Sequence, residues 1–168
     1  MNEVIRTILN RRSIRSYLPD PIPQETMNTV IQAGLAAPSA MNQQSWHFVV
    51  LQGAGAQRYR NYCIEKLGRD PYYGAPAMIL VFAKKDAIAP ICDGSLAIGN
   101  ILLSATSLGL GCCWIHCVND LFKDGIHVEE WGVPEGYRPV GSVALGFSDG
   151  PVPEAKPRAD GTVTMVEA

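Results

Sequence analysis

Charge and long apolar runs are both scarce in this sequence. Charged residues make up only 18% of the 168 residues, and the formal net charge is −2. Dedicated nucleic-acid binders usually carry a basic excess, and a membrane span needs roughly 18 consecutive apolar residues, so the sequence argues against both classes. Hydrophobic residues still form 47% of the chain, which excludes disorder and suffices for a buried core. We expect a cytoplasmic globular protein with a single domain over residues 1–168, part of whose surface a partner subunit covers.

The motifs of several common active sites are also missing. The sequence contains no G-x-G-x-x-G, P-loop, G-x-S-x-G or H-E-x-x-H motif. Its cysteines form no C-x-x-C pair, and Cys112, Cys113 and Cys117 lie in an apolar segment, which favours small buried side chains over a metal site. No arrangement of Ser, Cys and His nominates a nucleophile, and His47 and His116 lie in apolar strands, where we expect them to pack. If the protein is an enzyme, we therefore expect a bound cofactor to carry the reaction.

Hydrophobic periodicity and turn residues divide the chain into helices and strands. Helices are predicted over residues 2–11, 23–36, 54–67 and 93–108, and a further short helix over 120–131. Strands are predicted over residues 47–52, 75–83, 111–118 and 139–147, and the tail ends in the strand-like TVTMV. Because helices and strands do not alternate strictly, we predict an α+β fold in which helices flank a mixed central β-sheet, followed by an extended C-terminal tail. The helix over 93–108 is apolar nearly all round, which predicts burial in the core or in a subunit interface.

Three segments carry polar groups suited to a small anionic or heterocyclic ligand. In RRSIR, residues 11–15, guanidinium forks and a hydroxyl match the oxygens of a phosphate. The loop over residues 37–46 groups amides and hydroxyls that match the edge of a heterocycle. Lys156 and Arg158 place two cations in the tail. Each segment also has a plainer interpretation: a solvated helix end, an ordinary polar turn and a solvated tail.

The same segments belong to an ordered series of motifs. The series runs RRSIRSYLPDPIP, a helix, AAPSAMNQQSWHFVV, SLAIGNILLSATSLGLGCCWI, VPEGYRPVGSVALGF and AKPR. In this order, and over nearly the whole chain, it resembles the flavin-dependent nitroreductase family. The resemblance implies an α+β fold and a homodimer. It also implies FMN at the subunit interface, with NADH or NADPH as the electron donor.

The resemblance also implies which residues contact FMN. After the first helix, the leading arginine and the serine are matched to the phosphate side and the last arginine to the ring edge, in the set Arg11, Arg12, Ser13 and Arg15. A loop contributed by the other subunit is matched to Pro38, Ser39, Ala40 and Asn42. The strand end that flanks the isoalloxazine is matched to Trp114, Ile115 and His116, and further phosphate contacts to Lys156 and Arg158. Neither a metal nor a catalytic side chain is implied.

The activity that the resemblance implies is a ping-pong transfer of electrons from NAD(P)H, through FMN, to nitroaromatic, quinone or related acceptors. His116 and Cys117 stand where many family members have Glu-Gly, so the match does not define the acceptor. One alternative is another flavin reaction on the same fold, such as dehalogenation, enone reduction or flavin fragmentation. A second alternative is a non-catalytic flavin-binding or redox-sensing protein that uses the strand cysteines.

Overall fold

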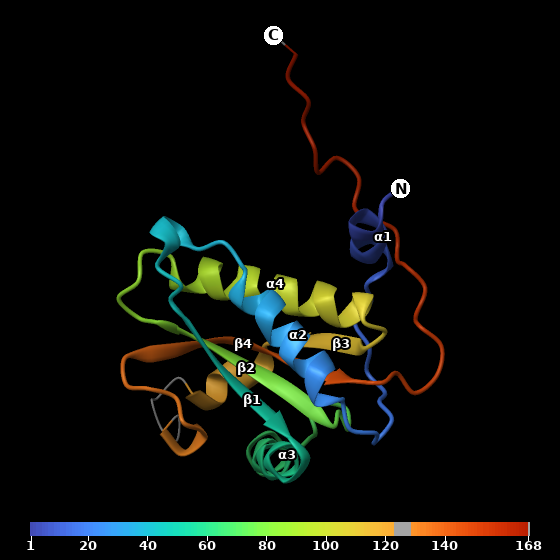
Figure 1. Ribbon diagram of the computed structural model, residues 1–168. Coiled ribbons are helices and arrows are strands. Elements are labelled where there is room, and N and C mark those ends of the chain that lie inside the picture. The colour runs from blue at the N-terminus through green and yellow to red at the C-terminus, as the bar shows by residue number, and fades with distance from the viewer. Residues whose placement is uncertain (123–128, 168) are drawn as a thin grey trace.

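Four strands pair into an antiparallel sheet in the order β1–β2–β4–β3 (Figure 1). The computed structural model describes residues 1–122 and 129–167. The strands are Trp46–Gln52 (β1), Ala77–Lys84 (β2), Gly111–Ile115 (β3) and Tyr137–Gly146 (β4). Every residue of β2 except the last is buried, because its apolar side chains point to two covered faces of the sheet.

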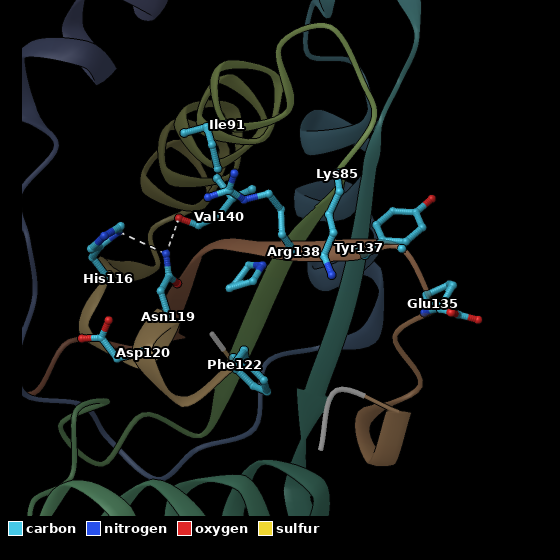
Figure 2. Close-up of a pocket in the computed structure, with 13 residues that line it drawn as sticks. Lys85, Ile91, His116, Asn119, Asp120, Phe122, Glu135, Tyr137, Arg138 and Val140 are labelled. Carbon is cyan, nitrogen blue, oxygen red and sulfur yellow. Dashed lines mark hydrogen bonds between the residues drawn. The ribbon is translucent and has the colours of Figure 1, made fainter. Parts of the chain in front are cut away.

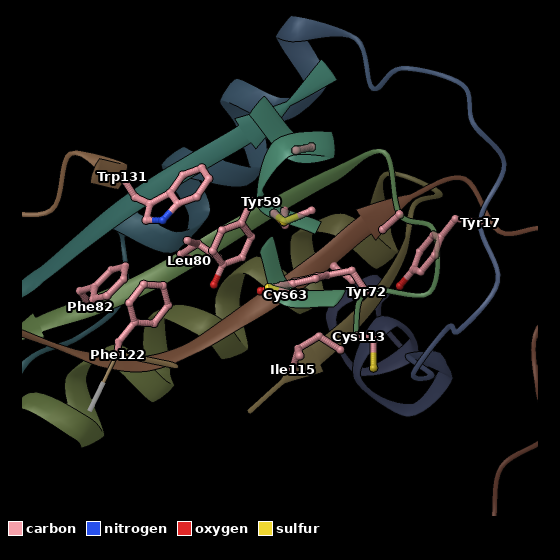
Figure 3. Packing of buried hydrophobic residues seen from close by; sticks show 14 of the residues in the cluster. Tyr17, Tyr59, Cys63, Tyr72, Leu80, Phe82, Cys113, Ile115, Phe122 and Trp131 are labelled. Atoms are coloured by element: carbon pink, nitrogen blue, oxygen red, sulfur yellow. The ribbon is translucent and has the colours of Figure 1, made fainter. Parts of the chain in front are cut away.

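The helices cover both faces of this sheet. They are Glu3–Asn10 (α1), Gln24–Leu35 (α2), Gly53–Leu67 (α3) and Pro90–Ser107 (α4), with short 3₁₀ helices at Ala40–Asn42, Cys117–Phe122 and Glu129–Trp131. α2 and α4 lie on one face and α3 lies on the other (Figure 1). The core on the α3 side is rich in aromatic rings, which include Tyr59, Tyr72, Phe82, Phe122 and Trp131 (Figure 3).

α4 is buried along one side and exposed along the other. Its start at Pro90 is compatible with helix geometry, because the first helical position has no intrahelical N–H bond to lose. Leu96, on its outer side, is 49% exposed, and Leu108, which follows the end of the helix, is 41% exposed. α1 has no buried residue, although it carries an apolar face. In the part of the chain that the structure describes, no helix has both the length and the apolar character that crossing a membrane requires.

The prediction of a mixed sheet was wrong for these four strands. All three ladders are antiparallel, and the one parallel pairing among the described residues is the isolated bridge between Ser13 and Cys112. A helix between two strands often makes them parallel. Here, however, residues 68–76 bring the chain from the end of α3 back to the end of β1 at which α3 began. Gln52 at the end of β1 therefore pairs with Ala77 at the start of β2, and β2 runs back along β1.

Three other expectations differ from the structure. The strand predicted over 111–118 ends at Ile115, because the Asn119 side chain donates to Val140 O at 2.9 Å, where a longer strand would continue the ladder. Of the helix predicted over 120–131, residues 123–128 lie outside the described residues, and the described flanks are 3₁₀ turns. The segment TVTMV forms no strand in the described chain, because it extends away from every sheet edge and has no partner there (Figure 1).

Candidate functional site

The basic segment Arg11–Arg15 runs beside the start of β3. Ser13 bridges to Cys112, and Ile14 donates its N–H to Cys112 O at 3.0 Å. Gly111 permits this close approach, since a Cβ at that position would lie 3.0 Å from Ile14 Cγ2. The backbone of the segment is therefore fixed against the sheet, while its polar side chains stay half-buried or exposed.

Arg12 has a buried donor without an acceptor in the described part of the chain. Its Nη1 donates to Leu9 O at 2.7 Å and to Arg11 O at 2.9 Å, but no described residue accepts from its buried Nε. Leaving a buried donor unpaired costs roughly 1–3 kcal/mol, and more for a charged group. Arg12 borders a cavity of about 410 Å³, which Ser148 and Val152 also line. An anion such as the phosphate of FMN is the kind of acceptor that fits this set of donors.

Arg15 has an aromatic neighbour that the sequence did not identify. Its guanidinium carbon lies 5.9 Å from the centre of the Tyr73 ring. Tyr73 sits in a turn that Asp70 organises, since the two Asp70 oxygens accept from Tyr72 N at 2.8 Å and from Gly74 N at 2.9 Å. The sequence DPYYG signals a turn, but nothing in it shows that the turn faces residue 15.

The loop that contains Pro38, Ser39, Ala40 and Asn42 lies at the opposite end of α4. Ala40 N donates to Asp93 Oδ1, in the first turn of α4, at 2.9 Å, whereas the basic segment adjoins the chain that leaves the other end of this helix. An 18-residue α-helix is about 27 Å long. One chain therefore does not bring this loop and Arg11–Arg15 to the same place.

The residues at the end of β3, which the sequence matched to the flavin ring, differ in their exposure. Trp114 is 39% exposed and Ile115 is 5% exposed. Ile115 thus offers backbone atoms rather than a side chain to a ligand, and its carbonyl accepts from Ser142 Oγ at 3.1 Å. The prediction that His116 packs inside the fold was wrong, because β3 ends before it and leaves it exposed in the following turn.

A cavity of about 680 Å³ opens beside His116 (Figure 2). His116 Nδ1 lies 3.4 Å from Asn119 Nδ2, which also donates to Val140 O. The lining contains charges of both signs and aromatic rings, namely Lys85, Arg138, Asp120, Glu135, Phe122 and Tyr137. Such a wall suits a small amphipathic molecule better than a simple anion. His47 on β1 does pack, with its ring centre 5.6 Å from that of Tyr137.

The two tail cations are exposed. No hydrogen bond or ion pair of Lys156 or Arg158 is recorded within the described residues, and the tail extends away from the sheet past α1 (Figure 1). The tail begins near the basic segment, however, because Asp149 N donates to Ser16 O at 3.0 Å. The structure therefore brings the start of the tail, but not its cations, to the N-terminal arginines.

The cysteines have no disulfide partner, and most of them are shielded. Burial raises the pKa of Cys63 to about 12. Burial also raises the pKa of Cys112 and of Cys113, although nearby arginines oppose the rise. Cys92, by contrast, is exposed. Within residues 1–122 and 129–167, no cluster of three or more His, Cys, Asp or Glu side chains could hold a metal ion.

Solved structures and sequence relatives are similar to this chain over nearly its whole length. The crystal structure of a nitroreductase with bound FMN from Bacteroides fragilis superposes with a TM-score of 0.91 at 32% identity, covering 99% of this chain and 100% of the other. A nitroreductase with bound FMN from Desulfitobacterium hafniense gives a TM-score of 0.85 at 30% identity, with 99% and 100% covered. The NADPH-flavin oxidoreductase of Vibrio harveyi is 32% identical over 99% of this chain and 74% of its own length.

The family model described as "Nitroreductase family" matches residues 8–147. The chain belongs to the nitroreductase family.

The thiols give a prediction about reactivity. At pH 8 we expect a maleimide reagent to label Cys63, Cys112 and Cys113 only after unfolding, because burial blocks access to these thiols and keeps them protonated. Mass spectrometry of digested samples measures the labelling of each thiol. Labelling of Cys112 in the folded protein as fast as in the unfolded protein would contradict the burial and support a redox role for the strand thiols.

Proposed function

We propose that the chain is an FMN-dependent oxidoreductase that takes electrons from NADH or NADPH and acts as a homodimer, each chain forming one domain over residues 1–168. The observation that carries this proposal is the basic segment fixed on β3, in which the buried Nε of Arg12 lacks an acceptor among the described residues. Two solved nitroreductases of this fold hold FMN, which supports FMN as the anionic ligand. Relatives named as NADPH-flavin oxidoreductase and FMN reductase [NAD(P)H] support the nicotinamide donor.

The residues that would hold FMN come from four segments. Arg11, Arg12 and Ser13 would bind the phosphate, which would satisfy the buried donor, and Arg15 would face the edge of the ring. The end of β3 would flank the ring with the outer side of Trp114, the backbone of Ile115 and the exposed His116. The tail would add Lys156 and Arg158 on the phosphate side, and a second copy would add its loop over residues 38–42.

In the proposed dimer, a second copy of the chain would complete each FMN site. The 38–42 loop and the Arg11–Arg15 segment lie at opposite ends of α4, so only a second chain, with its own α4 running the other way, would bring the two together. The outer side of α4 and the apolar face of α1 are exposed, with Val4, Leu9 and Leu96 between 49% and 65% exposed. Obligate homodimers commonly bury more than about 2,000 Å² of such surface, and these two faces are the candidates.

The chemistry that bound FMN supplies is the exchange of electrons between a nicotinamide and an oxidised acceptor. The chain's own part is to orient the cofactor and to stabilise the negative charge that reduction produces. The guanidinium group of Arg15, at the edge of the ring, would offset the negative charge that reduction brings into the site, while Arg11 binds the phosphate. The backbone pairing at Ser13 keeps these cations in place without a change of shape on binding, which lowers the cost of binding.

The cavity beside His116 is the proposed acceptor pocket. His116 would flank the flavin on one side and lines the 680 Å³ cavity on the other, so the cavity would adjoin the reacting ring. Its mixed charge and aromatic lining fit nitroaromatic and quinone acceptors, which combine a polar edge with an apolar ring. Donor and acceptor would use the site in turn, which gives ping-pong kinetics.

Turnover tests this function directly. We expect the purified protein to be yellow and to oxidise NADH or NADPH with menadione or nitrofurazone, with parallel lines in double-reciprocal plots of initial rates. Intersecting lines would contradict use of one site in turn. A yellow protein that neither nicotinamide reduces would contradict the enzyme and favour redox sensing. Reduction by NAD(P)H without turnover of either acceptor would favour another flavin reaction.

Removing one guanidinium tests the phosphate site. We expect Arg11→Ala to weaken FMN binding by about one to two powers of ten, because a charge-assisted hydrogen bond is worth roughly 1.5–3 kcal/mol. Lys156→Ala should have a smaller effect, because its ammonium is exposed and screened. The matched control is Arg6→Ala on α1, whose guanidinium lies 3.2 Å from Glu3 and should not affect FMN.

Titration of each apo-protein with FMN, followed by quenching of flavin fluorescence, measures these affinities. Equal affinities for Arg11→Ala, Lys156→Ala and Arg6→Ala would show that the two basic clusters are solvated surface.

A further inference from the structure

Asp93 is a buried carboxylate that does not cap its own helix. It lies in the first turn of α4 and is only 2% exposed. One of its oxygens accepts from Ala40 N at 2.9 Å, and the other accepts from Ser45 Oγ at 3.0 Å. The N-cap residue of α4, Ala89, has no side-chain hydrogen bond to the helix. The two carboxylate oxygens of Asp93 thus accept hydrogen bonds from both ends of the segment Ala40–Ser45, which we call the arch.

The arch has a backbone that needs outside support. Met41, Asn42 and Gln44 have φ values of 51°, 54° and 47°, a left-handed conformation that L-residues other than glycine adopt at a cost. Such a run persists where surrounding contacts over-determine it, and it is common at binding sites. The side chains of Met41, Asn42 and Gln44 are nevertheless exposed, and the bond from Gln44 Nε2 to Asn42 Oδ1 at 3.2 Å joins two of them only to each other. Intrachain packing of these three side chains therefore does not explain the conformation.

Other contacts brace the arch internally or anchor its base. Gln44 N donates to Ser39 Oγ at 2.9 Å, but this bond lies within the loop and does not attach the arch to the rest of the fold. Trp46 packs against Ala97 and fixes the strand that follows. Gln43 Oε1 accepts from Ile88 N, in the exposed segment before α4. Asp93 is the group that joins both ends of the arch to the buried side of α4.

We propose that Asp93 is a positioning residue for flavin binding, which holds the arch in the shape that closes the flavin site of the partner subunit. This inference rests on the proposed function, because it takes the arch as the part of the FMN site that comes from the second chain. Asp93 acts through its two hydrogen bonds. Among the described residues no cation pairs with it, and the positive end of the α4 dipole is the favourable charge nearby.

Two substitutions at residue 93 separate positioning from charge. Asp93→Asn keeps both bonds, because the amide oxygen can accept from Ala40 N while the NH₂ group donates to Ser45 Oγ, whose hydroxyl can turn to accept. Asp93→Ala removes both bonds. We expect FMN affinity within about threefold of wild type for Asn and at least about tenfold weaker for Ala. Equal weakening of FMN binding by the two substitutions would show that the hydrogen bonds of Asp93 do not account for its effect.

General destabilisation is controlled at a site far from the arch. Cys63→Ala truncates a fully buried side chain on α3, on the opposite face of the sheet, and should lower the unfolding temperature without changing FMN affinity. If Asp93→Ala does not fold, Ser45→Ala removes one of the two bonds and should weaken FMN binding by about threefold or more. Wild-type affinity in Ser45→Ala and in any folded Asp93→Ala protein would overturn the proposal.

A mixed dimer shows which subunit Asp93 serves. One subunit carries Asp93→Ala and the other Arg11→Ala, and two different affinity tags isolate the pair. If Asp93 acts on the partner's site, one of the two sites combines both defects and the other has neither. FMN titration should then find one wild-type site per mixed dimer, whereas neither mutant homodimer has any.

The FMN titrations separate a failure of the inference from a failure of the proposed function. A mixed dimer without a wild-type site would show that Asp93 serves its own subunit and would overturn the inference. Wild-type protein that binds no FMN would overturn the proposed function, and the inference with it. Wild-type protein that binds FMN, together with Asp93→Ala protein that binds it equally well, would overturn the inference alone.

Discussion

The burial of α4 against the sheet is the constraint on which the proposed site depends. One side of this helix packs on the strands through Ile98 and Ile101, which fixes its direction relative to β3 and β1. At one end, β3 holds the basic segment through the bridge between Ser13 and Cys112. At the other end, Asp93 holds the arch. A rigid element therefore sets the distance between the two parts of the proposed site, which in the proposed dimer would contact different FMN molecules.

Hydrogen bonds within the chain hold both parts of the proposed site in place. The arginine segment has its backbone bonded to β3, and the arch has its backbone bonded to a buried carboxylate, so neither needs to be ordered on binding. In the proposed site, a backbone fixed in this way would lower the entropic cost of binding. The unpaired Nε of Arg12 fits the same picture, in which the fold leaves a donor for a ligand anion to satisfy.

The sequence predicted the strongly periodic elements closely and their assembly poorly. The helix expected over 23–36 is Gln24–Leu35, because an apolar stripe that includes Met27 and Val30 repeats along it. The direction of the strand pairs depends on how far each connection carries the chain, which periodicity does not encode, so the mixed sheet was wrong. Asp93 was missed because its partners lie 53 and 48 residues away, and within its own helix it is one acidic residue in a first turn. His116 was misplaced because a side-chain bond from Asn119 ends the strand early.

Native mass spectrometry of the purified protein, followed by heat release and weighing of its cofactor, tests whether two chains share two FMN sites. We expect one particle of two 18.2 kDa chains carrying two FMN molecules, because each proposed site draws on both subunits. Loss of the flavin should accompany dissociation into single chains. A single chain that keeps FMN, or a stable dimer that carries FAD or no flavin, would contradict it.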